Sequence, residues 1–178
     1  MSKLKTIKDI NINEEEFVYN FQNELTKKLD NTKWYFSQEI INEIVLWKVN
    51  RYAILDNETL NLINDIDVKS NIIDIDLTSK LLEKLLNTKW IKLAMASTIL
   101  RFKNPSIYQI IDQRVYRFIY WKVMSLKWLK TDGIIKLYID YLLKLKEICS
   151  LNWINYSESD RVLYALDKKL NKDFKIKY

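Results

Sequence analysis

The sequence predicts an all-α fold, and three observations favour it. The 178 residues include one glycine and one proline, too few for the turns that a β fold needs. Apolar residues make up 48% of the chain, which is far from a disordered composition, and they recur at helical spacing. A chain of this length suits a single domain over residues 1–178, which we expect to consist of two helical lobes.

The N-terminal part is expected to hold an arm and three helices. Residues 1–13 form a flexible basic arm, and an amphipathic helix is predicted over residues 14–29. Ser37 is the predicted cap of a second helix. A shorter helix follows over residues 57–63. Trp47 on the second helix is a candidate for a pocket wall.

An acidic segment follows, and it leaves two interpretations open. Its two Asp-x-Asp pairs are Asp65, Asp67, Asp74 and Asp76. Such pairs bind divalent ions in nucleases, but nothing nearby completes a metal site. The acids are therefore expected to be a solvated connector, with Thr78 capping the next helix, over residues 81–86.

The remaining elements follow from apolar spacing and from capping residues. We predict helices over residues 91–102, 112–128, 134–149 and 157–170, with a turn over residues 131–133.

Positive charge is concentrated around one acid. Residues 89–130 contain nine Lys or Arg and one acid, Asp112, for a net charge of +8. The rest of the chain has twenty basic and twenty-two acidic residues, a net charge of −2. Such a field suits a polyanion, because Lys and Arg neutralise phosphates.

Asp112 stands where a helix should begin, so two roles are open to it. Cations favour the charged form of a nearby carboxylate, and a carboxylate can stabilise the oxocarbenium-like sugar formed when a glycosidic bond breaks. The simpler alternative is an N-cap paired with Arg114 or Arg117.

The residue inventory excludes several classes of site. Cys149 is the only cysteine and histidine is absent. A disulfide within the chain, a Cys/His zinc site, a four-cysteine iron–sulfur cluster and a Ser-His-Asp triad are therefore excluded. No cofactor or metal is expected. Without a signal peptide or a transmembrane-length segment, we expect a soluble monomer in the cytoplasm, associated with the nucleoid.

The stretch over residues 86–117 resembles the core of the helix-hairpin-helix (HhH-GPD) DNA glycosylase superfamily. That core is a hairpin, a helix, a proline-containing loop and a catalytic Asp that starts the next helix. The matching residues are Leu86 of the hairpin, Lys92 at the lyase position, Ala94 after it, Pro105 of the loop, Asp112 as the catalytic acid and Arg117 five residues later. Asn87, Thr88 and Trp90 replace the hairpin proline and glycines, and the loop is about two residues longer.

The resemblance implies a DNA glycosylase that excises a damaged or modified base from duplex DNA, in base excision repair or in defence against modified foreign DNA. Asp112 would be the catalytic carboxylate, and Lys92 would add lyase activity. The expected DNA-binding residues are Lys89, Arg101, Lys103, Arg114 and Lys122. The expected wall of the base pocket is Trp47, Tyr116, Tyr120 and Trp121. The alternatives are a non-catalytic helical DNA-binding protein and a metal-dependent nuclease.

Overall fold

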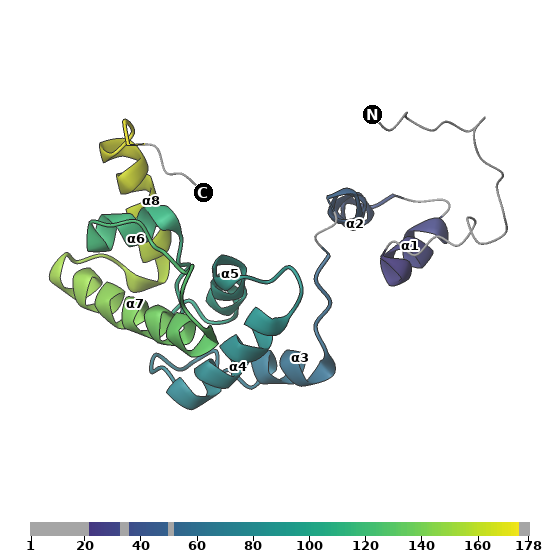
Figure 1. Ribbon diagram of the computed structural model, residues 1–178, viewed down its shortest axis with the longest axis horizontal. Coiled ribbons are helices and arrows are strands. Elements are labelled where there is room, and N and C mark those ends of the chain that lie inside the picture. The colour runs from purple at the N-terminus through teal and green to yellow at the C-terminus, as the bar shows by residue number, and fades with distance from the viewer. Residues whose placement is uncertain (1–21, 33–35, 50–51, 175–178) are drawn as a thin grey trace, which may run out of the picture. The chain divides into compact units, whose positions relative to one another are not determined.

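The computed structural model describes residues 22–32, 36–49 and 52–174. All regular elements among them are helices, with no strand, so the all-α prediction is confirmed for these residues (Figure 1). The chain divides into two compact units, residues 1–52 and residues 53–178. The predicted arm lies outside the described residues, and the single two-lobed domain stays a prediction.

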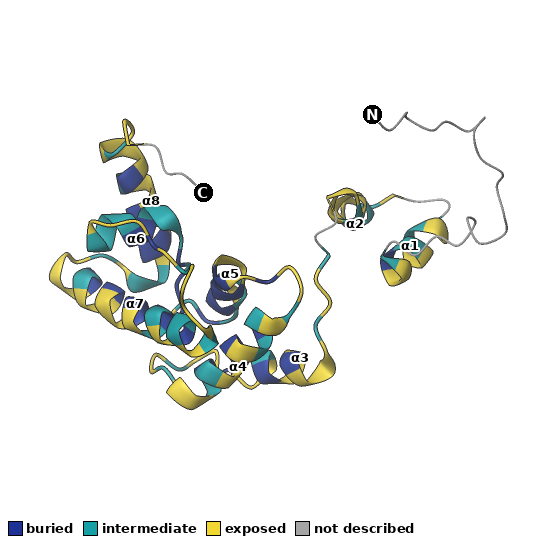
Figure 2. Cartoon of the chain, viewed as in Figure 1, coloured by how far each residue is buried: buried dark blue, intermediate teal, exposed yellow. Residues whose placement is uncertain are grey.

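The N-terminal unit contains α1 (Asn23–Asp30) and α2 (Gln38–Lys48). The single helix predicted over residues 14–29 is wrong at Gln22, which has φ of 45° and is the N-cap residue of α1. Residues 14–21 lie outside the described residues. Ser37 caps α2 as predicted, because its hydroxyl accepts a hydrogen bond from the first turn. None of the residues of α2 is buried (Figure 2).

The larger unit begins with α3 (Asn57–Asn64) and α4 (Ile75–Asn87). Carboxylates cap both helices: Asp56 accepts from a first-turn N–H at 2.7 Å and Asp74 does so at 2.9 Å. The cap predicted at Thr78 is therefore wrong. Thr78 lies inside α4 and is buried, and the N-cap is the aspartate four residues before it.

Two shorter helices follow, α5 (Leu93–Lys103) and α6 (Gln113–Tyr120). The helix predicted over residues 112–128 is too long, because α6 ends where Trp121 takes a left-handed conformation with φ of 57°. The Gln113 side chain then holds the backbone of Met124 through two hydrogen bonds, of 2.9 and 3.0 Å. This contact directs the chain away from the axis of α6.

The chain closes with α7 (Thr131–Leu151), the short 3₁₀ helix η3 (Tyr156–Glu158) and α8 (Ser159–Leu170). The turn predicted over residues 131–133 is wrong, because these residues form the first turn of α7. Asp132 lies in that turn, where a negative charge interacts favourably with the helix dipole.

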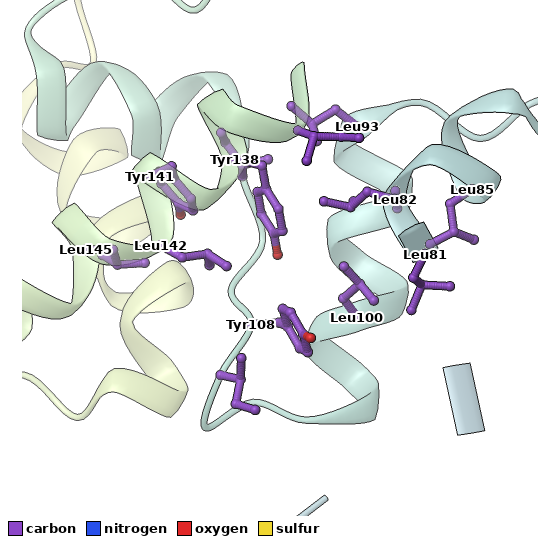
Figure 3. Packing of buried hydrophobic residues seen from close by; sticks show 14 of the residues in the cluster. Leu81, Leu82, Leu85, Leu93, Leu100, Tyr108, Tyr138, Tyr141, Leu142 and Leu145 are labelled. Atoms are coloured by element: carbon purple, nitrogen blue, oxygen red, sulfur yellow. The ribbon is translucent and has the colours of Figure 1, made fainter. Parts of the chain in front are cut away.

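One hydrophobic core spans the larger unit. Its most buried large side chains include leucines of α4, α5 and α7 and three tyrosines (Figure 3). They are Leu81, Leu82, Leu85, Leu93, Leu100, Leu145, Tyr108, Tyr138 and Tyr141. Each fully buried leucine contributes roughly 1.5–3 kcal/mol relative to an exposed one. This core surrounds the segment between α5 and α6, and that segment leads to Asp112.

Candidate active site

Asp112 is the N-cap of α6. Its backbone is extended, and its Oδ1 accepts a hydrogen bond of 2.8 Å from the N–H of Val115. The residue is half-buried. The carboxylate is thus fixed by the helix that it begins, while part of its surface remains open to solvent.

The segment that leads to Asp112 begins with a turn and continues as irregular backbone inside the core. Buried backbone groups need hydrogen-bond partners, and tyrosines supply three of them here. Tyr156 donates to the carbonyl of Ile107 (2.8 Å), Tyr138 to that of Gln109 (3.0 Å) and Tyr141 to that of Ile110 (2.7 Å).

Two further side chains accept from the same segment. The hydroxyl of Ser97 on α5 accepts from the N–H of Ile111 at 3.2 Å. The carboxylate of Asp160 on α8, which is 3% exposed, accepts from the N–H of Ile110 at 3.3 Å. Side chains from α5, η3, α7 and α8 therefore fix the approach to Asp112. The sequence gives no sign of these roles, because the partners are 14 to 50 residues apart.

The direction of the pKa shift of Asp112 differs from the expectation. Burial raises the pKa of this carboxyl above its usual range. Hydrogen bonds from the backbone N–H groups of Val115 and Arg114, together with the charge of Arg114, offset this increase only in part. The basic surroundings therefore do not lower the pKa, because desolvation is the larger effect. A raised pKa suits a carboxylate that accepts a proton during a reaction.

The turn between α4 and α5 carries Lys89 and Lys92. Both lysines are exposed, and the Nζ of Lys89 lies 5.3 Å from the centroid of the Trp90 ring. Trp90 has φ of 71°, a left-handed conformation that glycine adopts most easily. In the helix-hairpin-helix superfamily that this stretch resembles, the second hairpin glycine stands at this position. The left-handed backbone is thus present without the glycine.

Lys92 is the N-cap residue of α5, and its side chain makes no capping hydrogen bond. It precedes Ser97 by five residues, or about 7.5 Å of helix rise. Ser97 in turn binds the N–H of the residue before Asp112. One helix therefore carries Lys92 at its start and anchors the approach to Asp112 along its length.

Arg101 does not offer its charge at the surface, contrary to the expectation. Its side chain is 9% exposed, and its Nε lies 3.6 Å from the Oδ2 of Asp160. A second guanidinium nitrogen donates to the carbonyl of Ser157 at 2.9 Å. Arg101 is a structural link between α5 and α8, so we withdraw it as a DNA-binding residue.

Arg114 and Arg117 bind one carboxylate, that of Asp167 on α8. Arg114 contacts it at 3.2 Å, and Arg117 makes two hydrogen bonds to it, of 2.6 and 3.0 Å. Burial acts to raise the pKa of Asp167, but the hydrogen bonds and charges of the arginines lower it overall. Arg114 shares this carboxylate with Arg117, and its side chain remains 22% exposed, so its contact with DNA stays a prediction.

Two other predicted DNA-binding residues keep surface access. Lys122 is exposed, just after α6. Lys103 is half-buried, and its Nζ donates to the side chain of Asn64 at 3.2 Å.

Three of the predicted base-pocket residues, Tyr116, Tyr120 and Trp121, belong to the larger unit. The rings of Tyr116 and Tyr120 lie together, with centroids 4.5 Å apart and planes at 33°. Trp121 is 93% exposed, so its ring faces solvent. Trp47 belongs to the N-terminal unit, where its indole N–H donates to the Thr26 hydroxyl at 2.9 Å.

A cavity of about 1300 Å³ lies in the larger unit. Its walls are mostly apolar residues of α6, α7, α8 and the segments that follow them, among them Phe118, Trp121, Ile148, Leu163, Leu166 and Phe174. Asp112, Lys92, Tyr116 and Tyr120 do not line it. Trp121 is thus the one predicted base-pocket residue among those that line this cavity, and the cavity does not reach Asp112.

The acidic segment does not form a metal site in the described part of the chain. No group of three or more His, Cys, Asp or Glu residues there could hold a metal ion. Asp74 is occupied as the cap of α4, and Asp67 accepts from the N–H of Lys69 at 2.9 Å. Both carboxylates thus act on their own backbone.

Among residues 22–32, 36–49 and 52–174, no helix combines the length and apolar character needed to cross a membrane. Comparison of the chain with family models, curated proteins and solved structures gives no match.

Proposed function

We propose that this chain is a DNA glycosylase that excises a damaged or modified base from duplex DNA, with Asp112 as its catalytic carboxylate. The observation that carries the proposal is the placement of Asp112. It is half-buried, its pKa is raised, and it ends a segment fixed by five side chains from four elements. Such preorganisation is what a catalytic group needs, because a displacement of about 1 Å can cost roughly 100-fold in rate.

The chemistry follows from a carboxylate at that position. The target base is rotated out of the duplex, and its bond to the sugar C1′ breaks, with the electron pair leaving on the base. The ionised Asp112 stabilises the positive charge that develops on the sugar. Water then adds to C1′ and gives a proton to Asp112, which later returns it to solvent. No metal takes part in these steps.

Lys92 supports a second activity. Its amine, exposed at the start of α5, replaces water as the nucleophile at C1′ and forms a Schiff base with the opened sugar. Loss of a proton from C2′ then eliminates the 3′ phosphate and cleaves the strand. The amine returns to its free form when water hydrolyses the Schiff base.

The test is incubation with a panel of duplexes that each carry one modified base, followed by alkali to cleave abasic sites. We expect the wild type to release at least one base. Asp112→Asn should excise that base about 100-fold more slowly or worse, on the order of a general-base contribution. The matched control is Asp74→Asn, because Asp74 caps α4 as Asp112 caps α6, by accepting from the N–H three residues later. It should excise at the wild-type rate.

Borohydride added to the same reactions tests Lys92. Reduction of the Schiff base should trap a covalent protein–DNA adduct, and Lys92→Gln should not form it. Base release without an adduct would leave Asp112 working with water alone. A folded Asp112→Asn variant that excises at the wild-type rate would contradict the assignment of the catalytic residue. DNA binding without release of any base would favour the non-catalytic DNA-binding protein.

A further inference from the structure

The connection between α6 and α7, residues 121–130, presents aromatic rings and cations together; we call it the tryptophan–lysine loop. Trp121 is 93% exposed and Trp128 is 85% exposed. Lys122, Lys127 and Lys130 are also exposed, and the loop contains no acidic residue. An exposed apolar patch that is rimmed by polar residues marks an interaction site.

The fold fixes this display. The Gln113 amide holds the backbone N–H and carbonyl of Met124, and the Met124 side chain is turned inward, with 9% exposed. Trp121 has a left-handed backbone with φ of 57°, which is strained for a residue with a side chain. The middle of the loop is thus anchored in the protein while both indole rings face solvent.

We propose that the tryptophan–lysine loop binds single-stranded nucleic acid. Bases stack on the rings of Trp121 and Trp128, because every base has a flat face that suits an indole ring. The lysines contact the phosphates between them. Lys127 already lies with its Nζ 5.0 Å from the centroid of the Trp128 ring, so a stacked base would bring its phosphate close to that ammonium group.

An anionic lipid surface is the other partner that tryptophan and lysine could suit, and the geometry disfavours it. Insertion of the Trp128 ring into lipid would carry the Lys127 ammonium group with it, and removing that charge from water is unfavourable. Stacking requires no such desolvation of the lysine.

The proposed binding of single-stranded nucleic acid does not depend on base excision. Its test is binding of a fluorescein-labelled, unmodified oligothymidylate to the full chain, followed by fluorescence anisotropy. Trp128→Ala and Trp121→Gly should each weaken binding about tenfold, a typical loss for one stacked base. Glycine is used at Trp121 because it suits the left-handed backbone.

Trp153→Gly is the matched control. Trp153 is 96% exposed and also has φ of 57°, but the segment over residues 148–160 contains no Lys or Arg. This variant should bind as the wild type does. Replacing the three lysines of the loop with Gln should reduce the slope of log K against log[salt] by about 2, because each phosphate contact contributes roughly 0.7 to that slope.

Wild-type affinity in both tryptophan variants, checked to be folded by their melting curves, would overturn the proposal. An equal loss in Trp153→Gly would also overturn it, because stacking would then not be confined to the loop. Vesicles of phosphatidylserine and phosphatidylcholine provide the third test. Binding to them that depends on Trp121 and Trp128, with no binding of the oligonucleotide, would assign the loop to a lipid surface.

Discussion

Asp112 meets two requirements that act in opposite directions. As an N-cap it is favoured in the ionised form, because a carboxylate accepts strongly from the N–H groups of the first turn. As a half-buried group it loses hydration, and desolvation is the larger effect on its pKa. The folded protein therefore holds this proton more tightly than the unfolded chain does.

This shift predicts how Asp112→Asn changes stability with pH. Because the folded pKa is raised, ionisation of Asp112 destabilises the folded state as pH rises through that pKa. Asparagine is a comparable N-cap and carries no charge. We expect the melting temperature of Asp112→Asn, relative to the wild type, to be higher at about pH 7 than at about pH 4. Thermal melts of both proteins across this range measure the difference.

The opposite trend would contradict the desolvation argument. If the variant becomes relatively less stable as pH rises, the carboxylate is stabilised by its surroundings, and its pKa is lowered rather than raised. Asp74→Asn is the control, because Asp74 caps α4 but is exposed. It measures the effect of losing a capping charge without the effect of desolvation.

At the scale of elements, Asp167 joins α6 to α8. Its carboxylate is fully buried and accepts from two arginines of α6. Asp167→Asn would leave both guanidinium groups without this anion, and removal of one partner from a buried ion pair costs about 3–5 kcal/mol. We expect a loss of free energy of unfolding of about 3 kcal/mol, near the lower limit, because the arginines are partly exposed. Urea unfolding at about pH 7 measures it.

The pH dependence of Asp167 has the opposite sign to that of Asp112. Its pKa is lowered, so its contribution is present above the unfolded pKa and is lost as pH falls through the folded one. The wild type should therefore approach the stability of Asp167→Asn in acid. Asp173→Asn is the control, because Asp173 is an exposed carboxylate just beyond α8. An equal loss in that control would assign the effect to net charge.

The elements also show what the sequence could and could not predict. The start of α6 was predictable, because an aspartate before a periodic apolar run is a local signal. Its end was not, because no glycine follows it and the contact between Gln113 and Met124 is tertiary. The roles of Arg101 and Arg114 were likewise hidden. Their partners Asp160 and Asp167 lie more than fifty residues away along the chain, beyond any count of charge in a window.

At the scale of the whole molecule, these ion pairs change the meaning of the positive charge. Residues 89–130 carry nine cations, but three of them are arginines that pair with Asp160 or Asp167. The three arginines share two carboxylates, so one positive charge remains among them. Most of the charge left for an external polyanion therefore comes from lysines: Lys89, Lys92, Lys103, Lys122, Lys127 and Lys130. Of these, Lys89 and Lys92 lie in the turn before α5, so we expect duplex DNA to contact that end of the helix.

Salt dependence tests this surface. Each phosphate contact adds about 0.9 to the slope of log K against log[salt] for duplex DNA. A triple variant in which Glu replaces Lys89, Lys92 and Lys103 should therefore lose up to three phosphate contacts. Its slope should be smaller by about two to three. The matched control replaces three exposed lysines of α8 and the residues after it, namely Lys168, Lys169 and Lys172. It changes net charge equally.

Both sets should weaken binding through long-range repulsion, but only the first should remove phosphate contacts and lower the slope by this amount. Equal slopes for the two sets would show that duplex DNA responds to net charge alone, and that Lys89, Lys92 and Lys103 do not contact its phosphates.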